Sequence, residues 1–326
     1  MFVYILRRFV NLIPTFFLAT MLAWIVVDIA PGDFASQFAF DQVDPNRAER
    51  IRQSLGLDQP WYVRYGFWMR NLLTDFSFGI SMTSRGEVTD LIVPRMLNSL
   101  RLLLPATLLI FIIAIPIGVY SALNKYSVGD RILTVFSLIG LAIPNFFLAL
   151  IFLAFAVQWY QAFDFFLIPT GGMTSQNYSQ LSAWGKLIDS LWHLAAPLIV
   201  VAISSLAFIT RIMRGEMLEV LGQDYIRTAR AKGLAENVVN YKHALRNAIL
   251  VIVATIGGIL PGLIGGAGTV EFVLGWPGIT PLLIRSIFAQ DVYVIMAILT
   301  IITILLMIGN LISDLALALI DPRIRY

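Results

Sequence analysis

The sequence has 326 residues, of which 58% are hydrophobic and 13% are charged, and its mean hydropathy is +0.80. This balance is typical of a chain whose surroundings are mostly lipid, and it excludes an ordinary soluble globular protein. The net charge is only +3 and the basic residues are spread over separate polar segments, so nucleic acid is not an expected partner.

Residues 1–30 are expected to form a cytoplasmic N-terminal segment and the first membrane helix. Arg7 and Arg8 precede an apolar run over 9–27. A signal peptide begins in a similar way, but this run is long and no small-residue cleavage site follows it, so we expect the helix to be retained. Ala30-Pro31-Gly32-Asp33 predicts its end.

Residues 31–101 are expected to form an external loop with short helices. Asp44-Pro45 is typical of an N-cap and a first helical position, and Gly56 predicts the end of that helix. Pro60 opens a second helix, whose residues Trp61, Tyr65, Trp68 and Leu72 recur at helical spacing. The favoured interpretation places this aromatic face on the membrane surface. The alternative is a surface for an extracytoplasmic partner.

Five further apolar stretches cover 102–123, 132–163, 190–210, 247–270 and 292–313. Each is long enough to cross a hydrocarbon core of about 30 Å. The second of them is longer than one crossing needs and is expected to tilt or bend at Pro144. The sequence therefore predicts an all-α membrane protein with six transmembrane helices, of which five form a core over 102–320.

The distribution of basic residues predicts the orientation. If the N-terminus is inside, the short inner segments carry most of the lysine and arginine, including Arg323 and Arg325, and the short outer loops carry only Lys186 and Arg285. Positive charge in short loops marks the cytoplasmic side. Both termini, with the tail 321–326, are therefore expected in the cytoplasm.

A polar hairpin over 214–246 separates the fourth and fifth of the six predicted spans. Asp224 is a suitable N-cap, Tyr225 to Lys232 carries strong helix formers, and Gly233 offers a left-handed helix stop. A second helical run from Ala235 to Leu245 continues into the next span. The part of the hairpin from residue 221 onward holds five basic residues, namely Arg227, Arg230, Lys232, Lys242 and Arg246. Chemistry alone leaves two interpretations open, a common basic cytoplasmic loop and a docking element for a soluble partner.

The end of the fifth span holds the candidate pathway or gate residues. Gly258, Gly262 and Gly266 repeat at four-residue spacing and predict close helix contact. Glu271 lies at the edge of the apolar span, where a charge is costly, and Trp276 follows in a Trp-Pro-Gly turn. Simple packing explains the glycines at least as well as a pore-lining role does.

The sequence contains no recognisable catalytic or cofactor motif. It lacks a phosphate-binding loop, an H-E-x-x-H and a G-x-S-x-G pattern. It has no cysteine, and we expect His193 and His243 to be structural because they stand apart. We therefore predict a chain with no catalytic residue, cofactor or metal of its own. A channel or proton-driven transporter is the less favoured alternative, since mid-membrane acids are missing.

The hairpin segments YIRTARAKGL and HALRNAIL closely resemble the "EAA" loop of ABC importer permeases, in the form found in dipeptide and oligopeptide importers. LGLDQP, EFVLGWPG and the terminal DPRIR resemble the same family, so the likeness covers nearly the whole chain. The chain is identified as the first of the two homologous permeases of such an importer. One departure is Val251, where family members commonly have proline.

The resemblance implies the type I importer permease fold and a multi-pass location in the cytoplasmic membrane of a prokaryote. It implies a second permease, an extracytoplasmic binding protein and two cytoplasmic ATPases that bind ATP and magnesium. Di- and oligopeptides are the expected substrates, with oligosaccharides and nickel chelates as alternatives. The residues that it assigns to ATPase coupling are Asp224, Tyr225, Ile226, Arg227, Thr228, Ala229, Arg230, Ala231, Lys232, Gly233 and Leu234.

Overall fold

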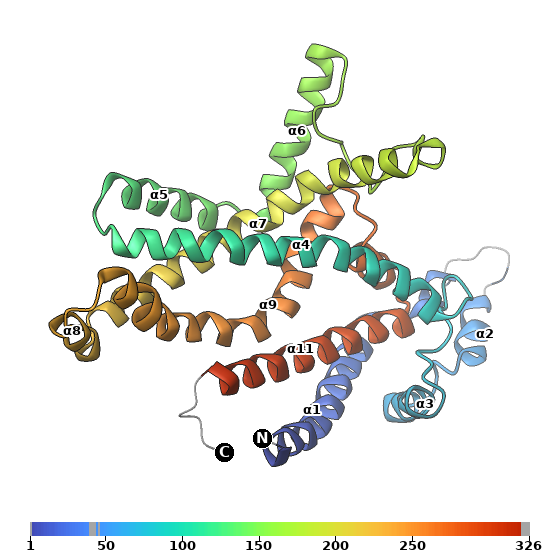
Figure 1. The fold of residues 1–326 in the computed structure, drawn as a ribbon. Coiled ribbons are helices and arrows are strands. Elements are labelled where there is room, and N and C mark those ends of the chain that lie inside the picture. The colour runs from blue at the N-terminus through green and yellow to red at the C-terminus, as the bar shows by residue number, and fades with distance from the viewer. Residues whose placement is uncertain (1, 39–43, 45, 321–326) are drawn as a thin grey trace. The chain divides into compact units, whose positions relative to one another are not determined.

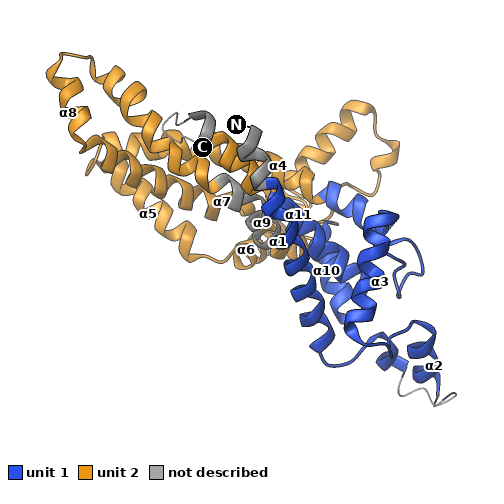
Figure 2. Cartoon of the chain, turned by 90° about the horizontal axis from the view of Figure 1, so that it is seen from below, with its two compact units in different colours: residues 1–98, 278–307, 326 blue, residues 99–277, 308–325 orange. Residues whose placement is uncertain are grey.

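The computed structural model describes residues 2–38, 44 and 46–320, and the surroundings of their side chains except at 2–8, 256–266 and 317–320. Some of the predictions therefore fall outside the described part of the chain. They concern Gly258, Gly262 and Gly266, the side chains of Arg7 and Arg8, and the tail 321–326. The described part is helical apart from loops and one isolated bridge between Ile80 and Glu87. The chain divides into two compact units, residues 1–98 with 278–307, and residues 99–277 with 308–325 (Figure 2).

Long helices cover most of the apolar stretches of the sequence (Figure 1). Among the described residues, five helical segments are long and apolar enough to cross a membrane, namely Phe9–Phe38, Val88–Leu123, Asn145–Phe163, Ala183–Leu221 and Val292–Ala316. The helices are α1 (Phe2–Ile29), α2 (Arg47–Ser54), α3 (Trp61–Thr74), α4 (Val88–Leu123), α5 (Val128–Ala142), α6 (Asn145–Phe163), α7 (Ala183–Leu221), α8 (Asp224–Ala231), α9 (Leu245–Val273), α10 (Ile279–Phe288) and α11 (Val292–Ile320). Short helical turns are η1 (Phe34–Phe38), η2 (Tyr178–Gln180) and η3 (Val238–Ala244).

The first unit is held together by an aromatic cluster between α1 and α3. The Trp24 ring of α1 lies 5.6 Å from the Trp68 ring and 5.8 Å from the Tyr65 ring, measured between centroids. The Thr20 hydroxyl is 3.0 Å from the Tyr65 hydroxyl. The prediction that this aromatic face lies on the membrane surface is therefore wrong. Trp68 is instead buried in one cluster with Trp24 of α1, and Trp61, Tyr65 and Leu72 pack partly buried against that cluster. Other positions of α3 expose Tyr62 and Phe67.

The start of α2 agrees with its prediction in part. The helix begins at Arg47, and Asn46, at the N-cap position, makes no side-chain cap hydrogen bond. Asp44 lies before the helix, where its carboxylate accepts a hydrogen bond from the Asn46 N–H at 3.2 Å and its main-chain carbonyl accepts one from the Arg47 N–H at 3.0 Å. Gly56 follows the helix with a φ of +63°, as its predicted role as a stop requires.

The second unit is organised around α7, which contacts α5, α6 and α9. Pro197 lies buried inside this 39-residue helix without ending it, because neighbouring helices surround that turn. Both α4 and α7 extend beyond the apolar stretches that predicted them, since α4 begins at Val88 and α7 ends at Leu221. Charged residues mark where a helix leaves hydrocarbon, but they do not end a helix.

The stretch 132–163 is two helices and not one bent helix. Proline lacks the N–H that would bond to the preceding turn, and it restricts the residue before it to extended backbone. Ile143 has φ −88° and ψ 118°, and Pro144 occupies the N-cap position of α6. The break sends α5 along α7 and lets α6 pack against α9 and α7.

Candidate functional site

The predicted hairpin lies in the second unit, where α8 follows α7 after only two residues. Gln223 is the N-cap of α8 and makes no side-chain cap hydrogen bond. Asp224 is therefore the first helical residue of α8. The prediction that it is the N-cap is wrong. Its carboxylate still lies in the first turn, where negative charge is favourable, and it pairs with Arg227 at 3.2 Å.

The α8 helix is attached to the unit through two side chains on one face. Ile226 is 0% exposed and Ala229 is 7% exposed, and both belong to a core cluster that includes Met213 and Met217 of α7. Residues three apart share one side of a helix, so this contact fixes the rotation of α8. Burying one isoleucine side chain contributes about 1.5–3 kcal/mol, which is a firm attachment for a helix of two turns.

The turn after α8 is a Schellman motif. The Gly233 N–H donates to the Arg230 carbonyl at 2.9 Å, and the Leu234 N–H donates to the Ala229 carbonyl at 3.4 Å. Gly233 has a φ of +75°, which confirms the predicted left-handed stop. A Cβ at this position would meet no atom within 4 Å, so only backbone strain opposes a side chain there.

The second arm of the hairpin runs into α9 through a π-helix, η3. The backbone is helical from Glu236, and the segment from Val238 to Ala244 widens into π geometry. A π-helix bonds residue i to i+5, so residues five apart lie close to one face. Val239 and Ala244 are both 0% exposed and join the cluster that holds Ile226. Such π segments are rare in proteins, and those that occur often lie at functional sites.

The remaining side chains of the hairpin form an exposed surface that is basic and partly aromatic. Its basic members are all exposed, and among the described residues Lys232, Lys242 and Arg246 have no ion-pair partner. Arg230 pairs with Glu236 across the glycine turn at 2.9 Å. The large apolar side chains on this surface are Tyr225, Leu234, Val238 and Tyr241, each 37–55% exposed. We call these residues and the five basic ones the hairpin face.

An ion pair with a buried carboxylate lies at the base of the hairpin, and the sequence did not predict it. Arg214 of α7 donates to both carboxylate oxygens of Asp130, at 2.8 and 3.0 Å, and the Ser121 hydroxyl also donates to that carboxylate. The hydrogen bonds from Arg214 hold the pKa of the Asp130 carboxyl well below its usual range, although burial opposes this. The pair ties the start of α5 to α7 one residue from Met213. Ser127 caps α5 at its Asp130 N–H, and this Ser-x-x-Asp pattern was the available signal.

The candidate gate residues lie at the opposite end of α9 from the hairpin. Glu271 is 2% exposed and accepts a hydrogen bond from the Ser99 hydroxyl at 2.5 Å. Trp276 is also 2% exposed and belongs to the cluster that contains Val270 and Leu274. The Gly172 N–H donates to the Leu274 carbonyl at 3.1 Å and holds the 164–182 loop there. Gly262 and Gly266 lie in the part of α9 whose surroundings are not described.

The predicted site residues therefore form two groups and not one. The hairpin group comes together as a single unit, whereas the Glu271 group belongs to a separate core cluster. His193, predicted to be structural, is buried and its Nδ1 lies 2.8 Å from the Asp189 carbonyl oxygen. No group of three potential metal-ligating side chains occurs within the described residues.

Comparison with known proteins places both units in one family. Residues 114–326 match the binding-protein-dependent transport system inner membrane component, and residues 1–102 match the N-terminal part of such membrane components. The chain belongs to this permease family. Family members are membrane components of transport systems, so this permease is a multi-pass transport subunit and not an enzyme.

Three relatives match the permease over its whole length. The oligopeptide transport system permease protein AppB of Bacillus subtilis is 40% identical over 327 residues, which is 99% of each chain. The dipeptide transport system permease protein DppB of Alkalihalophilus pseudofirmus is 31% identical over 339 residues, covering both chains completely. The glutathione transport system permease protein GsiC of Escherichia coli K12 is 32% identical over 326 residues, again 99% of each chain.

Proposed function

We propose that this permease is the first of two homologous permease subunits in a peptide importer of a prokaryotic cytoplasmic membrane. Relatives named for oligopeptide, dipeptide and glutathione transport support a peptide substrate. Each of these substrates contains an amide-linked chain of amino acids, which makes peptides a better match than oligosaccharides or nickel chelates. The binding protein would select the substrate before this subunit receives it.

The proposed topology has six crossings with both termini in the cytoplasm. The crossings are α1, α4, the α5–α6 pair, α7, α9 and α11. The α5 helix has 15 residues and is only about 22 Å long at 1.5 Å per residue, so it does not cross alone. Basic residues in the short segments assigned to the inside support this orientation. The core over 102–320 would line half of the pathway, with Glu271 and Trp276 at its outer end.

The hairpin face is proposed to dock on a cytoplasmic ATPase. The observation that carries this assignment is the division of α8 into a buried side and an exposed side. Ile226 and Ala229 bind the helix to its own subunit, and the exposed basic and aromatic residues offer a surface to a second protein. Aromatic and arginine side chains are the types that contribute most at protein interfaces. An ordinary basic loop needs no such rigid attachment.

The mechanism follows from how firmly α8 is attached. ATP and magnesium would bind to the two ATPases, whose closure moves the hairpin face. Because Ile226 belongs to the same core cluster as Met213 and Met217, displacement of α8 would move α7 with it. The Asp130–Arg214 pair joins that part of α7 to α5, so the helices would move as one body. Such rigid-body motion would alternate the pathway between its inward and outward openings.

Reconstitution of the four-component importer in liposomes tests the proposal. ATP hydrolysis and uptake of labelled peptide are measured together, with loaded and with empty binding protein. We expect uptake to require both ATP and the loaded binding protein. Hydrolysis stimulated by a loaded binding protein without peptide uptake would reject peptide and favour a sugar or a metal chelate. Hydrolysis that no loaded binding protein stimulates would contradict the importer assignment.

A further inference from the structure

The first unit contains a cavity of about 640 Å³ that the transport mechanism does not use. This volume falls in the range of about 300–1,000 Å³ that is typical of ligand sites. One wall is apolar and comes from the ends of α1, α10 and α11. Its residues include Trp24, Val26, Leu283, Ile287 and Ile295. The polar part of the lining holds two ion pairs, Asp28–Arg64 and Asp33–Arg52.

The cavity lies where a membrane helix ends. Asp28 is the second-last residue of α1, and the preceding turns expose large apolar side chains, including Leu22 at 59% and Val26 at 70%. Such a surface is the one that faces lipid. Val26 also lines the cavity, so the apolar wall continues from the lipid-facing side of α1. The charged groups therefore lie at the level where hydrocarbon gives way to lipid headgroups.

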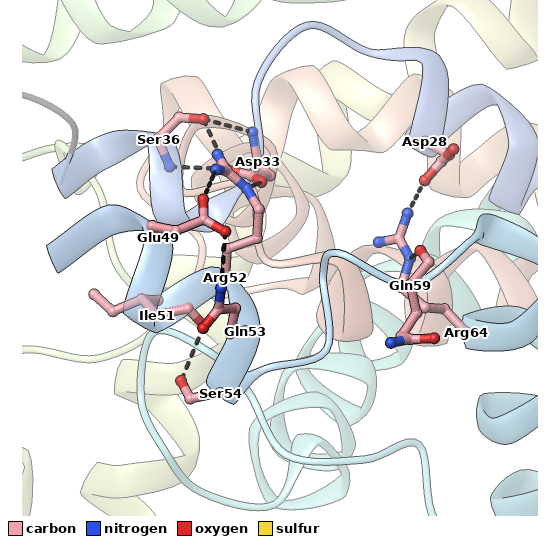
Figure 3. Close-up of polar contacts among 10 residues, drawn as sticks. All are labelled: Asp28, Asp33, Ser36, Glu49, Ile51, Arg52, Gln53, Ser54, Gln59 and Arg64. Atoms are coloured by element: carbon pink, nitrogen blue, oxygen red, sulfur yellow. Dashed lines mark hydrogen bonds and ion pairs between the residues drawn. The ribbon is translucent and has the colours of Figure 1, made fainter. Parts of the chain in front are cut away.

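The Asp33–Arg52 pair makes its hydrogen bonds within the protein (Figure 3). The Asp33 carboxylate accepts hydrogen bonds from the Ser36 N–H at 2.8 Å, the Ser36 hydroxyl at 2.7 Å and the Arg52 Nε at 2.7 Å. Arg52 Nη1 donates to Glu49 at 2.8 Å. Both members have their hydrogen-bonding groups engaged, so this pair holds η1 to α2 and offers little to a ligand.

The Asp28–Arg64 pair is different (Figure 3). Arg64 Nη2 donates to one oxygen of Asp28, and its Nε donates to the Gln59 carbonyl at 3.1 Å. Among the described residues, the Nη1 of Arg64 and the second oxygen of Asp28 make no hydrogen bond. The two side chains are only 18% and 25% exposed. The cavity is thus lined by one cationic donor and one anionic acceptor, side by side, with no net charge.

We propose that this cavity binds a zwitterionic phospholipid with a primary ammonium group, such as phosphatidylethanolamine. The phosphate would bind the free guanidinium nitrogen of Arg64, because arginine matches phosphate geometry. The ammonium would bind the free carboxylate oxygen of Asp28, and one acyl chain would lie along the apolar wall. An anionic lipid fits less well because it would leave Asp28 facing a negative headgroup. A bound peptide would need partners for its amide groups, which the apolar wall does not supply.

Native mass spectrometry of the assembled importer tests this site. The complex is delipidated in detergent and reloaded with phosphatidylethanolamine, phosphatidylcholine, phosphatidylglycerol or diacylglycerol, each with and without inorganic phosphate. We compare the wild type with the double variant Asp28→Asn/Arg64→Gln, which removes both charges together and so leaves neither unpaired. Arg50→Gln is the matched control, because Arg50 is an exposed residue of α2 outside the cavity lining.

We expect one tightly retained phosphatidylethanolamine in the wild type and in the Arg50→Gln control. Retention should be at least about tenfold weaker in the double variant, since each of the two lost hydrogen bonds to a charged group is worth about one power of ten in affinity. The three other lipids should be retained less, and inorganic phosphate should not compete. Equal retention by the double variant, equal retention of phosphatidylglycerol, or displacement by a soluble peptide would each overturn the proposal.

Discussion

The two polar helical segments of this permease use their charges in different ways. The hairpin and the segment from Asp33 to Thr74 are both short helices with a left-handed glycine turn, Gly233 at φ +75° and Gly56 at φ +63°. In the second segment the inner aromatic face packs on α1, and Asp33 and Arg52 bind each other. In the hairpin face the five basic residues are all exposed, and among the described residues Lys232, Lys242 and Arg246 have no ion-pair partner.

This difference separates a self-contained structure from a docking surface. Charges that are satisfied within one chain contribute to its own stability and give a partner little to bind. A helix that is anchored by buried residues and keeps charged and aromatic groups exposed is prepared for a second protein. The comparison predicts that hairpin variants change the coupling of ATP hydrolysis to uptake, whereas variants of the other segment do not.

The largest effect is expected for Ile226→Ala. This change removes the main buried contact of α8, and truncating a buried isoleucine to alanine costs about 3 kcal/mol. We expect the variant to insert and to hydrolyse ATP, with most of the hydrolysis uncoupled from uptake. Simultaneous assays of hydrolysis and uptake in proteoliposomes measure this. Thr228→Ala on the exposed side of the same helix should leave the fold intact, so the two variants together separate loss of attachment from loss of docking surface.

Removing the ion pair at the base of the hairpin should have the next largest effect. Arg214→Gln leaves the carboxylate of Asp130 buried without its cation, at a cost of about 2 kcal/mol after allowing for the partial exposure of Arg214. The midpoint of thermal unfolding in detergent should fall. The double variant Asp130→Asn/Arg214→Gln should recover most of that loss because no buried charge remains. If the double variant is no more stable than Arg214→Gln, the pair does not act as described.

The prediction of these features from sequence succeeded where local chemistry decides the structure. Gly233 was recognised as a left-handed stop because only glycine adopts that backbone at low cost. The end of α1 and the helical hairpin followed from Pro31-Gly32 and from helix formers in the same way. Sequence alone failed where a distant segment decides. The aromatic face of α3 was predicted to lie on the membrane surface because its packing partner was not visible locally. That partner, Trp24, lies 44 residues before Trp68 in the sequence.

Other errors have the same origin. The break at Pro144 was placed correctly but read as a bend, since the choice between a kinked helix and two helices depends on what packs around it. Asp130 and Arg214 are 84 residues apart, and no local pattern links them. The π-helix between Val238 and Ala244 likewise depends on the packing of Val239 and Ala244 against α7 and α8.

A smaller effect is expected at the glycine turn. Gly233→Ala forces a Cβ into left-handed backbone, at a cost of about 1 kcal/mol, without any steric contact. The end of α8 should fray, and the number of ATP molecules hydrolysed per substrate should rise about twofold. Gly233→Asn separates strain from bulk, because asparagine tolerates this backbone better than alanine does. If Asn disturbs coupling more than Ala does, the side chain obstructs docking and strain is not the cause.

The smallest effect is expected for Arg52→Gln in the first unit. Its pair with Asp33 is partly exposed to solvent, with 32% and 26% of the side-chain surfaces accessible. Such pairs contribute less than about 1 kcal/mol. We expect a shift of a few degrees at most in thermal unfolding and an unchanged ratio of hydrolysis to uptake. A change in that ratio without a loss of stability would show that this segment also takes part in coupling.

Site-specific cross-linking tests the central claim, that the hairpin face docks on the ATPase. The chain has no cysteine, so each introduced cysteine is unique. Thr228→Cys lies on the exposed side of α8, and Ser54→Cys in α2 is the control on the other polar segment. With a short photoactivatable cross-linker on the assembled importer, we predict a covalent product between Thr228→Cys and the ATPase and none from Ser54→Cys. An intact complex in which Thr228→Cys yields no ATPase product would contradict the account.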